Sequence, residues 1–211
     1  MNQRYLAYIT IAMNFLAIHA TASEVLTVEV KIDGDVYRMH GESIIQAPTD
    51  FVFNILADYD NFHRITNGIA ESRYLEPDDD GVLLGYTRID SCVWFYCRRF
   101  EKVERIWTTA PNEIITEAIP EKSDFKIGNA RWTLQSVENG TLVIYDADID
   151  PDFWVPPVIG PWAFKKKLRD SAEVIGWRIE YLLKSGKSLS EFGSESGVED
   201  STGAMTVSEP K

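Results

Sequence analysis

Few residues in this chain stand in a pattern that could do chemistry. His40 and His63 could each act as a general base, but they do not cluster in the sequence. Asp146 and Asp148 alternate along one extended segment and could form a carboxylate pair of altered pKa. Apolar residues occupy the other side of that segment, so we expect both acids to face solvent. Motifs for a nucleophile elbow, a zinc protease, a phosphate loop or a dinucleotide site are absent from the sequence. The sequence therefore predicts no catalytic residues and no cofactor.

The two cysteines, Cys92 and Cys97, are five positions apart. A lone C-x4-C lacks the second ligand pair that a zinc site needs, so we predict no metal site. In an exported protein an even pair of cysteines indicates a disulfide. If residues 93–96 form a four-residue hairpin loop, the two cysteines face each other across the strands.

The same hairpin register opposes charged residues. Arg88 then faces Glu101 and Asp90 faces Arg99, which is a favourable cross-strand arrangement. On the other face the register opposes apolar residues, namely Ile89 with Phe100 and Leu83 with Ile106. Two interpretations of the charged residues stay open. They either decorate a solvated face, or Arg88 and Asp90 act as polar anchors at the mouth of a ligand cavity.

A proline- and tryptophan-rich segment covers residues 153–162 and precedes the basic run 165–169. Its large side chains are candidates for a loop or lid: Phe153, Trp154, Ile159 and Trp162. Tryptophan beside basic residues is also typical of a membrane interface, so transient membrane contact is a further possibility. The third alternative is a rigid, packed connection, because prolines also form sharp turns between packed elements.

The first 22 residues have the layout of a cleaved secretory signal peptide. Arg4 supplies a positive start, an apolar stretch follows, and the small residues Ala20 to Ala22 form a cleavage site. The sequence thus predicts a periplasmic or secreted protein that is cleaved after Ala22. The net charge of −12 argues against nucleic acid as a partner, because phosphates would be repelled.

The rest of the chain predicts an α+β domain. Residues 24–31 and 36–47 read as a β-hairpin with a turn at 33–35. A short helix follows from about residue 49 to 58, and residues 162–184 form the longest amphipathic helix. Between the helices, turn residues separate six runs that form an antiparallel meander, at 71–75, 82–93, 95–107, 113–119, 125–137 and 141–149. Residues 185–211 are rich in Ser, Gly and Glu and read as a disordered tail.

Two strands and the long helix carry apolar faces that could line a cavity. Trp132 and Leu134 share one side of their strand, and Val143, Tyr145 and Ala147 share one side of the next. The buried stripe of the helix contains Phe164, Leu168, Ala172, Ile175 and Ile179. One long amphipathic helix must bury its stripe against the sheet, and a gap between them is a normal ligand site.

The stretch ESIIQAPTDFVFNILADYDNF, residues 42–62, resembles the first strand, proline turn and opening helix of the START-like (SRPBCC) superfamily. This superfamily includes polyketide cyclase/dehydrase and coenzyme Q-binding relatives. The resemblance covers about residues 36–184, and it implies a helix-grip fold, in which a curved antiparallel sheet wraps around a long C-terminal helix. Here a signal peptide precedes the domain, which we place at residues 23–184 and which begins with an extra N-terminal strand pair.

The resemblance also implies a function. Relatives mostly bind or carry lipids, sterols, quinones or polyketides, and a minority catalyse cyclisation or dehydration. We therefore expect an exported protein that binds a hydrophobic small molecule between sheet and helix and is not an enzyme. The alternatives are a cyclase/dehydratase-type enzyme, or an interaction module that docks a partner or a membrane through residues 153–162.

Overall fold

The structure is a computed structural model that describes residues 23–93, 96–155 and 160–192. The predicted signal peptide and residues 193–211 lie outside the described residues. Eight strands form one antiparallel sheet in the order β1-β2-β8-β7-β6-β5-β4-β3. Their bounds are β1 Glu24–Asp33, β2 Val36–Ile45, β3 Ile69–Leu75, β4 Leu83–Val93, β5 Tyr96–Thr109, β6 Glu113–Ala118, β7 Phe125–Val137 and β8 Gly140–Pro151.

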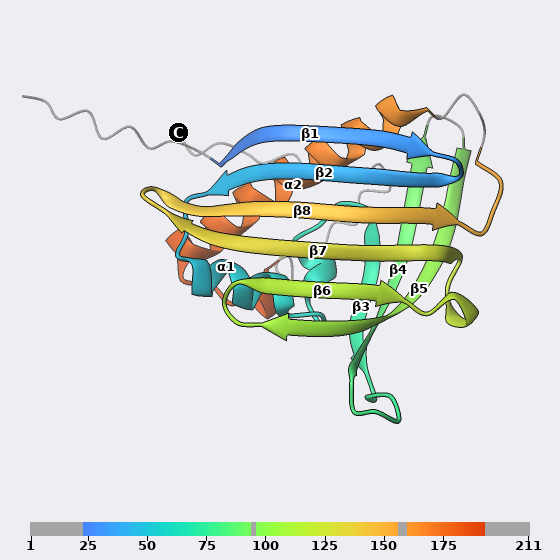
Figure 1. The fold of residues 1–211 in the computed structure, drawn as a ribbon. Coiled ribbons are helices and arrows are strands. Elements are labelled where there is room, and N and C mark those ends of the chain that lie inside the picture. Colours follow the sequence, from blue (N-terminus) through green and yellow to red (C-terminus); the bar gives the residue numbers. More distant parts are fainter. Residues whose placement is uncertain (1–22, 94–95, 156–159, 193–211) are drawn as a thin grey trace, which may run out of the picture.

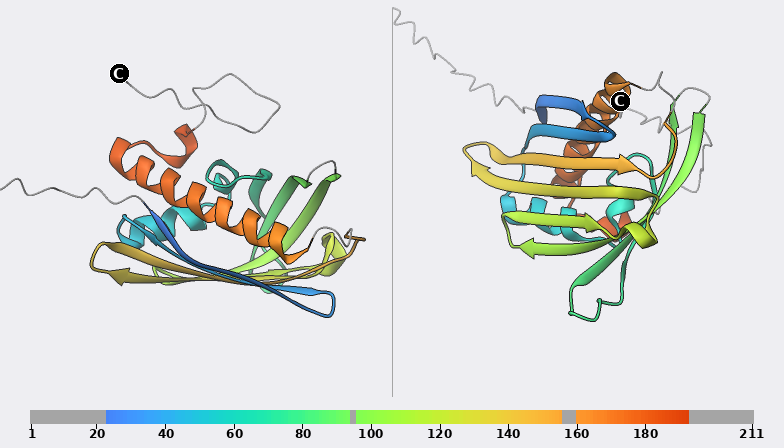
Figure 2. Two further views of the ribbon diagram at one scale, coloured as in Figure 1. Left: turned by 90° about the horizontal axis from the view of Figure 1, so that it is seen from above. Right: turned by 45° about the vertical axis from the view of Figure 1, so that its right-hand side comes forward.

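In the part of the chain that the structure describes, two α-helices complete the domain, namely α1 (Thr49–Ala57) and α2 (Pro161–Ser185). Two short 3-10 turns in the same part, η1 (Phe62–Arg64) and η2 (Pro120–Lys122), lie in connections, and a third, η3 (Leu189–Glu191), follows α2. The sheet curves, and α2 lies across its concave side with α1 beside it (Figures 1 and 2). The α+β helix-grip fold predicted from the sequence is therefore confirmed, including the added N-terminal hairpin β1–β2.

The strand alternation explains how the core forms. Apolar side chains of β2, β7 and β8 point to the concave side, where α1 and the stripe of α2 cover them. The resulting cluster contains Ile45, Val52, Leu56, Leu134, Val143, Ile175, Ile179 and Leu182, all of them buried. Helix α2 ends at Ser185 and is capped by Gly186, whose positive φ of 68° is a left-handed conformation that glycine adopts without steric cost.

The chain after α2 packs further than its composition suggests. Residues 186–192 belong to the stretch 185–211 that the sequence predicts as a disordered tail, yet they contain η3. Leu189 is buried against the core, and a capping box between Ser188 and Glu191 fixes the turn. Phe192 packs against the ring of Tyr181 on α2, so the described fold continues to residue 192.

The β4–β5 hairpin has the predicted register. Cys92 pairs with Cys97 and forms a disulfide, and Asp90 pairs with Arg99. The predicted loop length was wrong, because Val93 also pairs with Tyr96 and the loop is two residues long. The strands therefore extend one pair beyond the disulfide.

Candidate functional site

Two adjoining pockets lie between the concave side of the sheet and α2. The inner pocket has Glu104 and Trp132 in its wall, and the mouth pocket has Phe153 and Phe164 in its wall. Each has a volume of about 260 Å³. They share the wall residues Asn67, Ile89, Tyr145, Ile149, Leu168 and Ser171, so they form one interrupted space. Such a space, lined mostly by apolar groups with a few polar ones, is typical of a small-molecule site.

The inner pocket is built largely from the strands and helix that the sequence singled out. From the sheet, Trp132, Val143 and Tyr145 line it. From α2, the lining residues are Leu168, Ala172 and Ile175. The two periodicities bring them together, because every second strand residue and every third or fourth helix residue points into the same space.

Other predicted lining residues lie elsewhere in the interior. Leu134 and Ile179 are fully buried and fill the core beside the cavity. Phe164 lines the mouth pocket, where its ring lies 4.2 Å from that of Tyr37. Ala147 is buried on the same side of β8 as Tyr145 but lines neither pocket.

Arg88 and Asp90 line neither pocket, so their assignment as ligand-binding residues is wrong and the alternative interpretation, a solvated face, is the one that the structure supports. Ile89 between them lines both pockets, so alternation along β4 directs its two neighbours to the opposite face. On that face Arg88 Nη1 donates to Glu71 at 2.7 Å and Arg99 Nε donates to Asp90 at 3.0 Å. These are partly exposed ion pairs of the solvated surface.

The most informative polar residues of the cavity were not predicted. Glu104 is 0% exposed and lines the inner pocket together with Lys102. Tyr59 donates a hydrogen bond from its hydroxyl to Glu104 Oε1. Lys102 Nζ lies 2.6 Å from Glu104 Oε2, yet that oxygen accepts no hydrogen bond of good geometry. The cavity wall thus contains a buried carboxylate oxygen with unused accepting capacity.

Burial of this polar cluster changes the pKa values of its tyrosines. Desolvation raises the pKa of Tyr59 well above its ordinary value, and the neighbouring charge of Glu104 adds to that shift. Burial likewise raises the pKa of Tyr145, with Glu104 as the second cause. Both phenols therefore stay protonated and remain hydrogen-bond donors at neutral pH. The hydroxyl of Thr87, on the same wall, is buried without a hydrogen-bond partner.

Gly85 on β4 makes room for this cluster. A Cβ atom at this position would lie 2.4 Å from the ring of Tyr59 and 2.7 Å from Ile106. Only a residue without a side chain lets the ring of Tyr59 lie against β4, from where its hydroxyl reaches Glu104.

A signal for the cluster was present in the sequence. The predicted hairpin register places Phe100 and Ile106 on the apolar face of β5. Side chains alternate along a strand, so Lys102 and Glu104 lie on that same face. Two charged residues between two apolar ones on an inward face indicate a functional site, because buried charges are rare unless paired.

The mouth pocket is bounded by the segment that precedes α2. Phe153 stacks on Phe100 with ring centroids 4.4 Å apart, and the guanidinium of Arg98 lies 4.5 Å from the Phe153 centroid. Trp154 and Trp162 are 68% and 52% exposed and line neither pocket. Ile159, the fourth residue named for a lid, lies outside the described residues, and a lid at this segment stays a prediction.

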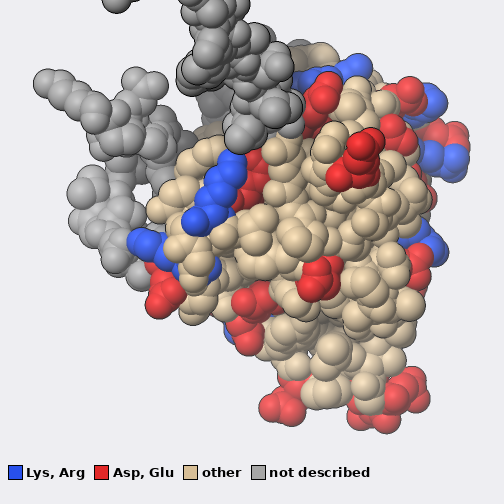
Figure 3. All heavy atoms as spheres, turned by 90° about the vertical axis from the view of Figure 1, so that its left-hand side faces the viewer, with Lys and Arg blue, Asp and Glu red and all other residues tan. Residues whose placement is uncertain are grey.

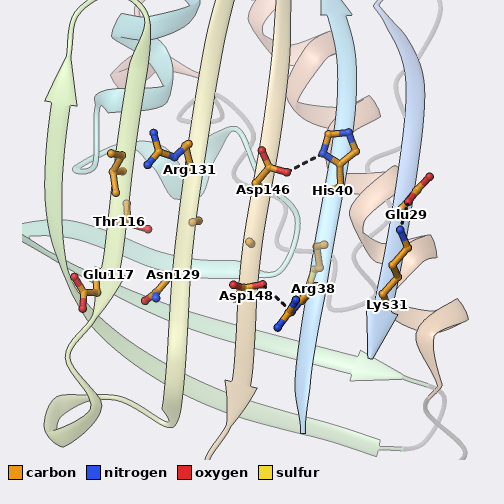
Figure 4. A pocket seen from close by; sticks show the side chains of 14 residues that line it. Glu29, Lys31, Arg38, His40, Thr116, Glu117, Asn129, Arg131, Asp146 and Asp148 are labelled. Atoms are coloured by element: carbon orange, nitrogen blue, oxygen red, sulfur yellow. Dashed lines mark hydrogen bonds and ion pairs between the residues drawn. The ribbon is translucent and has the colours of Figure 1, made fainter. Parts of the chain in front are cut away.

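The outer face of the sheet carries a shallow hollow of about 630 Å³ that is lined by charged residues (Figure 4). His40 Nδ1 lies 2.7 Å from Asp146 Oδ1, and this hydrogen bond is the main reason why the pKa of His40 is raised. Asp148 is exposed and lies 4.0 Å from Arg38. Both acids thus face solvent, and the charges there compensate one another. We therefore place the ligand site in the interior.

Neither His63 nor a group of metal-binding side chains forms a second candidate site in the described residues. The ring of His63 interacts with Ser72 at 3.0 Å, and partial burial lowers its pKa. Among residues 23–93, 96–155 and 160–192, His, Cys, Asp and Glu side chains form no group of three that could hold a metal ion. Within the same ranges no helix has the length and apolar character to span a bilayer.

A family comparison decides the relationship. Residues 45–173 match the family described as polyketide cyclase / dehydrase and lipid transport. The chain belongs to this family. The match covers α1, most of the sheet and the first half of α2, while β1 and β2, which add Val28 and Ser43 to the wall of the inner pocket, lie almost entirely before it. The START-like resemblance inferred from residues 42–62 is therefore confirmed.

Solved structures agree in fold at low sequence identity. The STAR-related lipid transfer protein from Xanthomonas axonopodis is 16% identical, with a TM-score of 0.59 over 75% of this chain and 99% of that one. Human STARD10 is 11% identical, with a TM-score of 0.57 over 76% and 75%. The Zhui aromatase/cyclase from Streptomyces sp. R1128 is 13% identical, with a TM-score of 0.50 over 72% and 99%. A comparison with curated proteins found no match to this chain. These solved structures thus share the fold of the chain, whose family is described as polyketide cyclase / dehydrase and lipid transport.

Proposed function

We propose that the chain is an exported carrier of an apolar small molecule whose polar end bears a hydroxyl or a similar hydrogen-bond donor. The observation that carries this proposal is the buried Glu104 Oε2, which lies in the wall of an apolar cavity and accepts no hydrogen bond. Lys102 Nζ is the ion-pair partner of this oxygen at 2.6 Å, but a carboxylate oxygen has more than one lone pair and can accept from a second donor. A ligand hydroxyl in the cavity would supply that donor to Glu104.

The charges in the cavity wall favour a ligand whose polar end is uncharged. Glu104 and Lys102 already compensate each other at 2.6 Å. A ligand carboxylate or phosphate would bring a second negative charge next to Glu104, with only one lysine to balance both. Like charges in a buried site disfavour each other, so we expect alcohols, phenols or enols to bind better than acids of equal length.

Two features support export as part of the proposal. Residues 1–22 have the layout of a signal peptide, and the chain forms a Cys92–Cys97 disulfide, as proteins of oxidising compartments do. Expression of the whole gene product in a Gram-negative host, followed by fractionation and intact-mass analysis, tests this. A periplasmic protein that begins at Ser23 is expected, and an unprocessed protein in the cytoplasm would contradict export.

Ligand binding is tested with two probes of equal chain length, 1-dodecanol and dodecanoate. Native mass spectrometry and displacement of a fluorescent apolar probe should show tighter binding of the alcohol. Replacement of the carboxylate by Glu104→Gln should reduce the preference by about tenfold, which corresponds to one hydrogen bond to a charged group. The matched control is Glu117→Gln on the outer face, which should leave the preference unchanged. Absence of any apolar ligand, co-purified or added, would overturn the carrier proposal.

A second candidate function is cyclisation or dehydration of a polyketone, and the same polar cluster favours it. A buried carboxylate beside an ammonium group could take a proton from a carbon between two carbonyls while Lys102 stabilises the enolate. Exchange of that proton for deuterium in D2O, followed by NMR on a 1,3-diketone probe, tests this step. Exchange that depends on Glu104 supports an enzyme, and a rate equal to the protein-free rate removes this candidate.

A further inference from the structure

We propose that the end of the molecule around the mouth pocket docks on an anionic membrane surface. The docking end consists of Trp154, Trp162, Lys165, Lys167 and Arg169, from the segment before α2 and from its first two turns. This proposal extends the proposed carrier function, because it states where the ligand would enter. Only the role in ligand entry rests on the carrier function; the docking itself does not. Vesicle binding can be measured without any ligand.

The docking end adjoins the mouth of the cavity, and its Lys167 lines the mouth pocket. Phe153 and Val155 line the mouth pocket, whereas Trp154 between them lines neither pocket and is 68% exposed. On α2, Ala163 and Phe164 line the same pocket, whereas Trp162 is 52% exposed. Two large exposed aromatic side chains are therefore direct chain neighbours of residues that line the mouth pocket.

The cations of the docking end have no ion-pair partners in the part of the chain that the structure describes. Lys165, Lys167 and Arg169 are exposed and take part in no ion pair there, while Lys166 is paired with Asp170 at 2.6 Å. The first turn of α2 contains no acidic residue. Cations near this positive end of the helix dipole do not stabilise the helix, so helix stability does not explain them.

Acidic residues near the docking end are paired with other cations, although Glu29, which is paired with Lys31 at 3.0 Å, also interacts electrostatically with Lys165. Asp152, next to Phe153, lies 3.6 Å from Lys126. Asp33, at the tip of the β1–β2 hairpin, lies 2.8 Å from Arg38. The face of the molecule that Figure 3 shows, in contrast, carries acidic and basic residues scattered among uncharged ones. The docking end is thus a locally basic, aromatic surface on a chain with a net charge of −12.

Its chemistry matches the headgroup region of an anionic bilayer. Tryptophan rings settle at the membrane–water interface, and lysine and arginine are attracted to anionic lipids. Each cation near such a surface strengthens binding about fivefold. Docking in this orientation would place the apolar mouth pocket against the bilayer, so an apolar ligand could transfer without crossing bulk water.

The test uses the chain from Ser23 onward, which contains every described helix and strand. Its co-sedimentation is measured with vesicles of phosphatidylcholine alone and of phosphatidylcholine with about 30% phosphatidylglycerol. Binding to the anionic vesicles only, and weaker binding at high salt, is expected. The triple change Lys165→Gln, Lys167→Gln, Arg169→Gln should weaken it by about 100-fold.

A matched control lies on the same helix. Trp177 is 44% exposed on α2 but lies toward the other end of the helix. Trp162→Ala should weaken vesicle binding several-fold, whereas Trp177→Ala should leave it unchanged. Equal binding to both vesicle compositions, no binding, or equal effects of the two tryptophan changes would overturn the proposal. Vesicle binding without ligand uptake would refute only the carrier function.

Discussion

The hydrogen bond between Tyr59 and Glu104 should contribute strongly to folding stability. Tyr59→Phe removes the donor to Glu104 Oε1 and leaves the ring in place. Glu104 is 0% exposed, so bulk water does not replace the lost hydroxyl. Hydrogen bonds to buried charged groups contribute about 1.5–3 kcal/mol, and we expect the free energy of unfolding to fall by about 2–3 kcal/mol.

Urea unfolding followed by circular dichroism measures this change. Tyr74→Phe is the matched control, because the hydroxyl of the half-buried Tyr74 donates to a neutral acceptor, the backbone carbonyl of Ala57. This control should lose only about 1 kcal/mol. A loss for Tyr59→Phe that is no larger than the control would refute the argument that the buried carboxylate depends on this donor.

A double-mutant cycle separates the hydrogen bond from packing. In a Glu104→Gln background the acceptor is neutral, so Tyr59→Phe should cost about 1 kcal/mol instead of 2–3. The difference is the coupling between the phenol and the charge. Additive effects of the two changes would show that the charge of Glu104 is not held by Tyr59.

Three further outcomes are expected from urea unfolding. Gly85→Ala should destabilise by about 1–3 kcal/mol, because its Cβ would overlap the ring of Tyr59; an unchanged midpoint would contradict this packing. His40 has a raised pKa, so the stability from its pair with Asp146 is present below pH 6.5 and lost as pH rises through the folded pKa; the loss should be under about 1 kcal/mol and absent in His40→Gln. Reducing the Cys92–Cys97 disulfide should cost about 2 kcal/mol, and no change would show that the reduced hairpin keeps its register.

The β4–β5 hairpin was predictable because its constraints agree. The cysteines, the opposite charges and the apolar pairs all require one register, and a shift of a single residue would break all of them. The loop length was not predictable in the same way. Nothing in the pairing pattern distinguishes a final strand pair at Val93 and Tyr96 from the first and last residues of a loop.

The sequence predicts which faces of the strands and of α2 point to the cavity, but not which individual residues on those faces line it. Periodicity assigns Leu134 and Val143 to the same side of the sheet, but it does not say which of them packs and which borders empty space. That choice depends on the position of α2 over each strand. Leu134 therefore fills the core, while Val143 borders the inner pocket.

The polar cluster of Tyr59, Lys102 and Glu104 could not be predicted from the sequence alone. Alternation along β5 places Glu104 on the inward face, but its partner Tyr59 lies 45 positions earlier, after α1. Only the fold brings the two together, with Gly85 as the space that allows it. The sequence showed which residues are inward, and the structure shows which of them lacks a hydrogen-bond partner.

The central claim is that an apolar ligand binds between the sheet and α2 with its polar end at Glu104. Methyl NMR of the protein with 1-dodecanol tests it most directly. Shifts and ligand contacts at the methyl groups of Val143, Leu168 and Ile175 are predicted, and they should weaken in Glu104→Gln. Contacts confined to methyl groups on the outer face, such as that of Ile144, or no contacts at saturating probe, would contradict the account.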